Sequence, residues 1–400
     1  MKAPNMCIAC KGARALCGNE RCPLLARVNV TPKLTGRIGT DFFGPSPSVF
    51  VGRIGYPNLY MGPLATFQEE ENPELMDTPS SWMNMSYDKI VEMRSMLIRS
   101  KSVQNIFSKS RFIEENQELA LAERPTDVEL NFSREPTYKV SFSDVHQPMG
   151  PSAPLEKMKI TENVKINRKV DRIVSDDLKA NESVLNLYDI DVDVYKITTI
   201  LSSGALGLEQ NQKLVPTRWS ITATDDMVAK NLIEQVKDFK SVSEFNVFEF
   251  EYLSNHFCIL AMPGNWEFEN FEAWAPGSFW SQGLKNTAIT EEYESFEGRK
   301  KYATEQGGGY YAARLGVVEG LSELKRQARI VSFREIYEGY TVPLGVWVVR
   351  EAARNAMRQL PVKFTTLKEA LAHINSRMRI DTSDYFSKSR ILRQKRLTEY

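Results

Sequence analysis

The stretch NVFEFEYLSNHFCILAMP, residues 246–263, gives the clearest indication of local structure in this chain. Phe248, Phe250 and Tyr252 alternate with polar residues, so they share one face of an extended segment. The run HFCILAMP is apolar, and Ser254-Asn255 falls between the two runs, where a turn belongs. The stretch therefore predicts a β-hairpin, with Cys258 as a core thiol of its second strand.

Helical patterns follow the hairpin. The segment GGGYYAARLGVVEGLSELKRQAR opens with three glycines and predicts a helix to about Arg329. Residues 344–359 predict a second helix, and a third begins near Thr366, because Glu369 completes the spacing of a capping box. The three glycines lack the Lys-Ser/Thr of a phosphate-binding loop, so we interpret them as a helix entry. The polar, basic residues after Met378 predict a flexible tail.

The part of the chain before the hairpin is less regular. Residues 36–64 are rich in Gly and Pro and predict turns with short strands. Spacing of apolar residues predicts a helix over Ser86–Ser100, and alternation over residues 183–201 predicts strands. The segment Arg218–Thr222 predicts a strand, followed by a helix over Asp225–Phe239. These elements together predict a mixed α and β (α+β) fold.

Composition and charge bound the class of protein. Hydrophobic residues make up 42% and charged residues 26% of the 400 residues, as in soluble globular proteins. No apolar run reaches the ~18 residues of a membrane helix, and the first residues lack the pattern of a secretory signal. We therefore expect a cytoplasmic protein without a membrane partner. Net charge is zero, but both ends are basic and residues 241–305 are acidic, which permits contact with a polyanion or marks solvated surface.

Four of the five cysteines lie within sixteen residues at the amino end, with the spacing C-x2-C-x6-C-x4-C. Disulfides are rare inside cells, so a tight cluster of this kind points to a metal. Four thiolates form the closed tetrahedral shell of structural zinc. An iron–sulfur cluster uses the same ligands, and a site without metal is the third alternative. The predicted ligands are Cys7, Cys10, Cys17 and Cys22.

Candidates for other chemistry are few. Asp225-Asp226 after a strand could hold Mg²⁺ or Mn²⁺, with Glu267 as a further ligand. Alternatively, Thr224 caps the helix and the two acids favour its first turn. Arg350, Arg354 and Arg358 recur at four-residue steps, which suits backbone phosphates or a solvated helix face. His256, between two strands, is interpreted as a turn or packing residue, with a catalytic base as the alternative.

The segment QKRLTEY, residues 394–400, has the spacing of a sliding-clamp-binding peptide. In that mode one helical turn places an aliphatic and an aromatic residue in an apolar pocket, and a glutamine forms hydrogen bonds beside it. The motif usually carries two adjacent aromatic residues, and here there is one. The predicted partner-binding residues are Gln394, Leu397 and Tyr400.

The whole chain resembles the archaeal Nre DNA-repair proteins. The resemblance rests on CIACKGARALCGNERCP, PSVFVGRIGYPNLYMGPL, LVPTRWSITATDD, MPGNWEFENFEAWAP, GGGYYAARLGVVEGL and VPLGVWVVREAAR. It implies a C4-type zinc finger on the four amino-terminal cysteines and a carboxy-terminal peptide for the replication clamp (PCNA). We therefore expect four parts: a zinc module at 1–35, a central mixed domain at 36–282, a helical region at 283–380, and a basic tail with the clamp peptide at 381–400.

Three hypotheses about function follow. The first is a nucleoid-associated DNA-damage repair factor that binds DNA and is recruited by the sliding clamp. The second is a metal-dependent DNA nuclease of the same pathway, in which Asp225, Asp226 and Glu267 hold the catalytic ion. The third is a scaffold that makes no DNA contact of its own.

Overall fold

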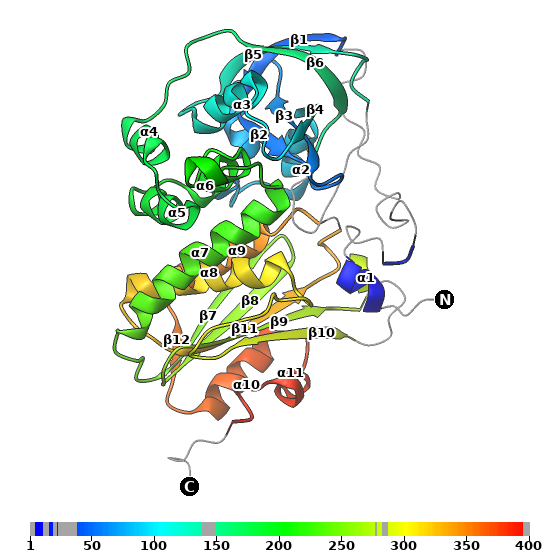
Figure 1. Ribbon diagram of the computed structural model, residues 1–400. Helices are drawn as coiled ribbons and strands as arrows, with labels where there is room; N and C mark the ends of the chain where they lie inside the picture. Colours follow the sequence, from blue (N-terminus) through cyan, green and yellow to red (C-terminus); the bar gives the residue numbers. More distant parts are fainter. Residues whose placement is uncertain are drawn as a thin grey trace. The chain divides into compact units, whose positions relative to one another are not determined.

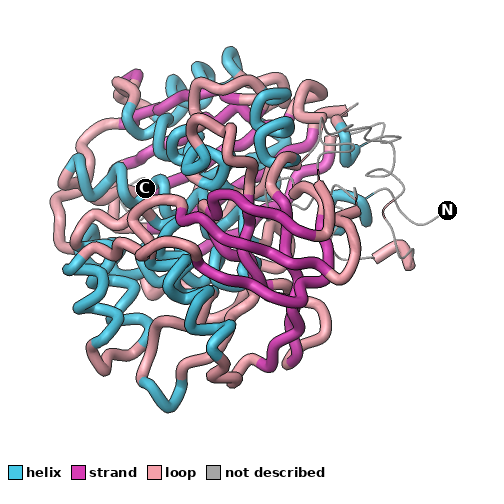
Figure 2. Tube along the Cα trace, turned by 90° about the horizontal axis from the view of Figure 1, so that it is seen from above, coloured by secondary structure: helices cyan, strands magenta, loops and turns pink. Residues whose placement is uncertain are grey.

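The computed structural model describes residues 5–10, 16–18, 22, 38–137, 149–276, 278–281, 287–341 and 343–394. Helices and strands both contribute large parts of the described chain (Figure 2), so the predicted mixed α and β class is confirmed. The chain divides into two compact units. Unit 1 comprises Met1–Val28, Ser143–Val145 and Ala229–Tyr400, and unit 2 comprises Asn29–Phe142 and His146–Val228.

Unit 2 contains a six-stranded sheet with the order β1-β5-β6-β4-β3-β2. Neighbouring strands are antiparallel, except for β4 and β6, which are parallel. The short strands predicted within residues 36–64 are confirmed. The strands are β1 (Asp41–Ser46), β2 (Ser48–Val51), β3 (Asn58–Ala65), β4 (Ile98–Asn105), β5 (Thr126–Phe132) and β6 (Ser152–Ile160).

The first two strands close this sheet into a barrel. Only Pro47 separates β1 from β2, so they form one bent strand that pairs with β5 through β1 and with β3 through β2. The amide of Thr66 donates a hydrogen bond of 2.9 Å to the carbonyl of Pro45 where β3 ends. A Cβ at Gly44 would overlap the Thr66 carbonyl oxygen, so the two chain segments approach closely only because residue 44 is glycine.

The interior of the barrel is filled by alternate residues of its strands. Val51, Leu59 and Met61 pack together in one buried cluster. Val49, Ile98 and Val128 belong to a second cluster, with Leu119 and Ala120 of the helix α3 (Arg111–Leu121). Residues at the intervening positions therefore face outward.

The remaining helices of unit 2 are α2 (Tyr87–Ser95), α4 (Arg168–Ser175), α5 (Ala180–Asp189), α6 (Val194–Ser202) and the first part of α7 (Thr217–Lys237). The predicted strands over residues 183–201 are wrong. Asp193 accepts a hydrogen bond of 2.9 Å from the Tyr195 amide and caps α6, and Val194, Ile197 and Leu201 recur at helical spacing on its buried side. Local alternation fits both structures, and burial of this helical face decides between them.

The predicted strand at Arg218–Thr222 is also wrong, because α7 begins at Thr217. The amides of Trp219 and Ser220 bond to the carbonyl of Pro216, at 2.7 and 3.0 Å. One helix therefore runs from Thr217 through Asp225, and Thr224 lies inside it rather than at its cap. Helix α2 ends at Ser95, earlier than predicted, because the chain continues into β4.

Unit 1 contains a second six-stranded sheet, of order β10-β9-β11-β8-β7-β12, in which β9 and β11 are parallel and the other pairs antiparallel. The predicted hairpin is confirmed as β7 and β8, although its turn falls at Leu253-Ser254, whose φ angles of 48° and 56° are both positive. The strands are β7 (Phe245–Tyr252), β8 (Asn255–Met262), β9 (Glu267–Trp274), β10 (Ala288–Glu294), β11 (Arg329–Ile336) and β12 (Val362–Phe364).

Helices cover both faces of this sheet (Figure 1). Helices α8 (Gly308–Leu324) and α9 (Trp347–Arg358) lie on one face, and α10 (Leu367–Arg377) and α11 (Thr382–Lys388) on the other. The central strands β8 and β11 are buried along their whole length for this reason. Gly307 enters α8 with φ of 59°, which agrees with the predicted helix entry. The capping box at Thr366 and Glu369 is also confirmed.

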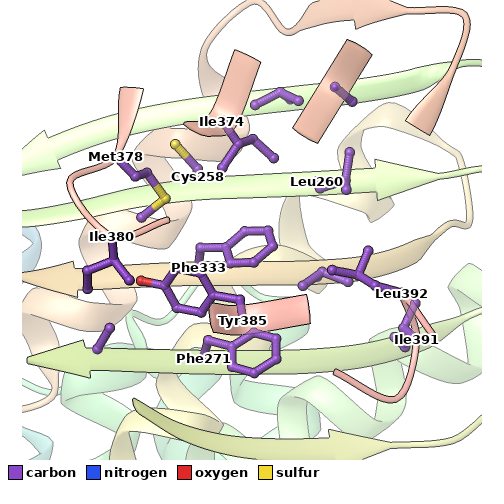
Figure 3. Close-up of a cluster of buried hydrophobic side chains, with 14 of the residues drawn as sticks. Cys258, Leu260, Phe271, Phe333, Ile374, Met378, Ile380, Tyr385, Ile391 and Leu392 are labelled. Atoms are coloured by element: carbon purple, nitrogen blue, oxygen red, sulfur yellow. The ribbon is translucent and has the colours of Figure 1, made fainter. Parts of the chain in front are cut away.

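The residues after Met378 form part of the core, so the predicted flexible tail over 381–394 is wrong. Tyr385 is completely buried, and Ile391 and Leu392 are 2% and 7% exposed. The ring of Tyr385 lies 5.4 Å from Phe271 of β9 and 5.1 Å from Phe333 of β11 (Figure 3). Polar residues dominate this segment, and only its contacts with the sheet show that its few apolar residues are buried.

The division into units differs from the predicted boundary at residue 282. Strands β9 and β10 pair along their length, from Ala288 opposite Trp274 to Glu294 opposite Phe268. Residues on both sides of the boundary therefore form one sheet. The predicted helical region over 283–380 contains α8, α9 and α10, but it also contributes strands β10, β11 and β12.

Candidate functional site

The amino-terminal cysteines belong to unit 1. Cys7 and Cys10 lie on α1 (Asn5–Cys10), which packs beside the short 3₁₀ helix η5 (Phe279–Ser281). Cys10 is buried at 7% exposure, and Cys7, Cys17 and Cys22 are partly buried. All four are free thiols.

The other three thiols of the group act electrostatically on Cys7. Burial raises the pKa of Cys7, and the negative charges of Cys22, Cys10 and Cys17 raise it further. A cation among them would offset the repulsion that opposes ionisation, and four sulfur donors suit Zn²⁺.

The end of the described chain is anchored to the sheet of unit 1. The guanidinium of Arg329, on β11, donates hydrogen bonds to the Ile391 carbonyl at 3.2 Å and to Gln394 Oε1 at 3.3 Å. Its Nε pairs with Glu267 Oε2 at 2.9 Å. Gln394, the first residue of the predicted clamp peptide, is therefore placed at the end of a fixed segment. Leu397 and Tyr400 lie outside the described residues.

A second carboxylate, Glu269, fixes the same segment from β9. It accepts hydrogen bonds from the hydroxyl of Ser389 and from the amides of Arg390 and Ile391, the amide of Arg390 at 2.6 Å. Glu291 on β10 lies beside it, so burial and the negative charge of Glu269 raise the pKa of Glu291 to about 7. Glu269 thus holds the turn that follows α11, and Glu291 pairs with the Arg390 side chain of the same turn at 3.4 Å.

The predicted metal ligands are divided between the two units: Asp225 and Asp226 belong to unit 2, and Glu267 belongs to unit 1. Asp225 is fully buried within α7 and Asp226 follows it on the same helix, whereas Glu267 pairs with Arg329 on β11. Among the described residues, none of the three belongs to a group of ligand atoms within 4.8 Å of one another. The interpretation of Asp225-Asp226 as a helix start is also wrong, because α7 begins eight residues earlier, at Thr217.

Two of the three arginines in the predicted row are withdrawn from solvent. Arg350 is 1% exposed, and Arg354 forms hydrogen bonds to both oxygens of Glu319 at 2.6 and 2.7 Å. Arg358 is exposed at the end of α9. The four-residue spacing therefore serves the packing of α9 against α8, and these residues do not form a phosphate-binding stripe.

The structure shows one cluster that the sequence did not indicate, around His256 on β8. His256 Nε2 lies 3.0 Å from Glu249 Oε1 and 3.8 Å from Cys258 Sγ, and its Nδ1 lies 3.1 Å from the Tyr337 hydroxyl. Arg377 donates to both oxygens of Glu249 at 2.9 Å. Part of this cluster could have been predicted from the β7–β8 hairpin, because Glu249 lies directly opposite Cys258 in its register.

This cluster has the geometry of a metal site but the environment of a hydrogen-bond network. Its three candidate donors, Glu249, His256 and Cys258, lie within 4.8 Å of one another. However, burial strongly raises the pKa of Cys258, which disfavours the thiolate that a metal needs. Glu249 already pairs with Arg377, so we interpret His256 as a packing residue, as the sequence suggested.

Comparisons with known proteins cover nearly the whole chain. Family profiles described as "Archaeal Nre, N-terminal" and "Archaeal Nre, C-terminal" match residues 16–281 and 294–400. A DNA repair protein NreA of Archaeoglobus fulgidus is 37% identical over 376 residues, 93% of each chain. NreB of the same organism is 36% identical over 98% of this chain and 99% of its own length. NreA of Haloferax volcanii is 36% identical over 86% of this chain and 85% of its own. No solved structure matches.

Proposed function

Because this chain belongs to the archaeal Nre family, whose members above are named DNA repair proteins, we propose that it is a repair factor that binds DNA and is recruited by the sliding clamp. Among the described residues, no helix has both the length and the apolar character to cross a bilayer. A protein that acts at DNA needs a way to reach it, and the clamp-type peptide at residues 394–400 offers one.

The observation that carries the recruitment is the anchoring of Gln394. Arg329 and Glu269 fix residues 389–394 against the sheet, and the predicted peptide begins at the last of these residues. A peptide that starts directly after a fixed segment is presented without an intervening linker, which keeps the effective concentration of the rest of the protein near the clamp high.

The test is retention of the purified protein on immobilised clamp. The double variant Leu397→Ala/Tyr400→Ala should lose retention, because both apolar anchors of the peptide are removed. The matched control is Lys395→Ala/Arg396→Ala, which changes two neighbouring residues outside the motif and should retain at least most of the binding. Equal retention of wild type and Leu397→Ala/Tyr400→Ala would exclude this mode of recruitment.

The same proposal includes a structural zinc ion. Cys7, Cys10, Cys17 and Cys22 would hold it, and a closed shell of four thiolates would supply folding stability to the amino-terminal segment rather than a catalytic water. The mutual effect of these thiols on the pKa of Cys7 supports a shared site.

Metal analysis of the purified protein tests this part. We expect about one zinc per chain in the wild type and in Cys258→Ala, which removes a cysteine from the core of unit 1. Cys10→Ser/Cys22→Ser should lose the metal. Iron with a visible absorption band would instead indicate an iron–sulfur cluster, and the absence of any metal in the wild type would contradict the site.

The alternative of a metal-dependent nuclease has less support. Asp225 and Asp226 lie within a helix, and Glu267 is engaged by Arg329. Labelled single-stranded and flapped DNA, incubated with Mg²⁺ or Mn²⁺, would decide it. Cleavage by the wild type that Asp225→Ala/Asp226→Ala abolishes would establish the nuclease, and no cleavage by the wild type would dismiss it.

A further inference from the structure

Unit 2 exposes a group of large apolar side chains around one end of its barrel, which we call the aromatic patch. Its members are between 48% and 76% exposed: Ile54, Tyr56, Tyr60, Val103, Phe107 and Trp219. Isolated exposed apolar residues are common on protein surfaces, but contiguous groups mark sites of interaction.

The members of the patch are neighbours in space. Tyr60 of β3 lies directly opposite Val103 of β4 in the antiparallel register. The ring of Tyr56 lies 5.4 Å from that of Trp219 at an angle of 44°. The amide of Ile106 donates to the Pro57 carbonyl at 3.0 Å, which brings the next residue, Phe107, beside the loop that carries Tyr56.

Backbone contacts hold these rings in place. Leu59 and Met61 fill the barrel interior, so Tyr60 between them projects from the outer surface. The amide of Val51 donates a hydrogen bond of 3.0 Å to the Thr217 hydroxyl, which fixes the start of α7, and with it Trp219, beside the loop between β2 and β3. The patch is therefore built on strands and a helix start rather than on one long loop.

The strand order of the barrel indicates what such a surface binds. Counting the bent strand β1/β2 as the first, the five strands pair in the order first, second, third, fifth, fourth and back to the first. The third and fifth strands are parallel, and α3 lies between the third and the fourth. This is the topology of an OB barrel, whose second and third strands and the loop before them bind oligonucleotides or oligosaccharides. Tyr60, Val103 and Tyr56 occupy these positions.

The charge of the surface around the aromatic patch favours an oligonucleotide over an oligosaccharide as its ligand. The segments that build the patch, residues 42–68, 93–113 and 210–224, contain eight Lys and Arg and no Asp or Glu. Three of these cations pair with carboxylates outside the segments, namely Arg94 with Asp77, Lys109 with Glu209 and Arg111 with Glu115, which leaves five. Arg99 and Lys101 occupy alternate positions of β4 with Val103 and share its outward face. Arg99 stacks over Phe50 at 5.4 Å, and within the described chain no carboxylate pairs with it. A surface of this charge is complementary to phosphates.

We propose that the aromatic patch binds single-stranded DNA, with bases stacked on Tyr60 and on the Tyr56–Trp219 pair and phosphates near Arg99 and Lys101. Unpaired bases expose the faces that stack on aromatic rings, whereas duplex bases do not. The inference rests on the proposed function only in naming DNA rather than RNA. It does not involve the clamp peptide or the zinc ligands.

Trp219 provides a direct measurement in the full-length protein. The other five tryptophans, Trp82, Trp266, Trp274, Trp280 and Trp347, are at most 2% exposed, and Trp219 is 48% exposed. Titration with a thymidine 20-mer should therefore quench mainly the Trp219 emission and protect it from iodide. Binding should weaken steeply with salt, because phosphate contacts release counterions.

Variants then assign the binding to the patch. By anisotropy with a labelled 20-mer, Tyr60→Ala and Trp219→Ala should each weaken binding about 5- to 150-fold, and Trp219→Phe should recover most of it. Arg99→Gln should weaken binding and lower the salt slope by about one. Phe43→Ala is the matched control, since Phe43 is an equally exposed aromatic of unit 2, 45% exposed, on β1. Circular dichroism verifies that each variant folds.

The outcomes separate this inference from the proposed function. Binding that Tyr60→Ala, Trp219→Ala and Arg99→Gln leave unchanged overturns the patch while DNA binding stands. If the wild type binds no single-stranded DNA, the patch as a DNA site is overturned and fits a protein partner, whereas clamp retention remains a separate result. If an RNA 20-mer competes better than DNA, the assignment to DNA is overturned.

Discussion

The hydroxyl of Tyr385 donates a hydrogen bond of 3.0 Å to Oε1 of Glu335, a fully buried carboxylate on β11. The same carboxylate accepts from the Tyr337 hydroxyl at 2.7 Å and from the amides of Arg379 and Ile380 at 2.9 and 3.0 Å. These four donors satisfy the oxygens of a buried carboxyl group, and three of them come from the segment after α10. The chain beyond Arg377 is therefore needed to complete the core of unit 1.

Substitution of Tyr385 tests this role. Tyr385→Phe should lower the free energy of unfolding by about 1–3 kcal/mol, because Glu335 loses a donor in a buried place. Tyr385→Ala should cost about 3–5 kcal/mol, since it also leaves a cavity between Phe271 and Phe333. The control is Phe386→Ala, at the next position, where the ring is 42% exposed. Urea denaturation measures all three, and equal effects at 385 and 386 would contradict the buried position.

Truncation separates the core from the clamp peptide. Removal of residues 395–400 should leave the unfolding midpoint unchanged, because the last buried residue that the structure describes is Leu392. Removal of residues 389–400 should lower it clearly, since it exposes the site of Ile391 and Leu392 and leaves Glu269 without its donors from the segment. Thermal denaturation compares the two, and an identical loss in both would show that stability depends on the peptide itself.

The pair Glu269 and Glu291 should make stability depend on pH. The pKa of Glu291 is raised from 4.5 to about 7 in the folded state, so the folded protein binds the proton more tightly than the unfolded chain. The contribution to stability is therefore full below about pH 4.5 and is lost as the pH rises through about 7.

Glu291→Gln should remove this decline and should be more stable than the wild type above pH 7. The unfolding midpoint is measured from pH 5 to 8.5. Glu297→Gln serves as the control, because hydrogen bonding from Ser295 lowers the pKa of this exposed carboxylate and it stays ionised throughout the range. If the unfolding midpoint of the wild type does not decrease as the pH is raised from 5 to 7, the coupling of the two carboxylates is contradicted.

Closure of the barrel in unit 2 depends on Gly44. A methyl group at this position would overlap the Thr66 carbonyl, so Gly44→Ala should push the bent strand away from the end of β3 at a cost of about 1–3 kcal/mol. Gly39→Ala is the control, because a Cβ there meets no atom within 4 Å. Chemical denaturation measures both, and equal stability of the two variants would show that the strands can separate freely at this point.

Local patterns were sufficient for some elements. The hairpin of β7 and β8, the entry of α8 at Gly307 and the capping box at Thr366 each depend on residues that are near one another in sequence. The elements that were predicted wrongly depend on distant partners. Residues 183–201 alternate as a strand would, and become helices because a helical face is buried. The segment after Met378 is polar, and its few apolar residues are buried only by β9 and β11.

The candidate sites also divide into those that depend on residues near one another in sequence and those that depend on distant partners. The cysteine spacing and the clamp motif are each contained in one short segment, so residue order alone is enough to predict them, and both stay predictions. The roles of Glu267 and Arg354 depend on Arg329 and Glu319, which lie 62 and 35 residues away. The OB topology could not be predicted either, because it depends on which strands pair and on Pro47 joining two short strands into one.

If residues 394–400 bind the sliding clamp as proposed, the anchoring of Gln394 limits the distance between unit 1 and the clamp. Tyr400 lies six positions after Gln394, and an extended chain spans at most about 3.6 Å per residue, so this distance is at most ~22 Å. Engagement of Gln394 by the clamp also requires its bond with Arg329 to be exchanged for a new one. In that arrangement a short peptide alone would join the clamp to the folded part of the protein, so the proposed DNA-binding surface would stay close to the DNA that the clamp encircles.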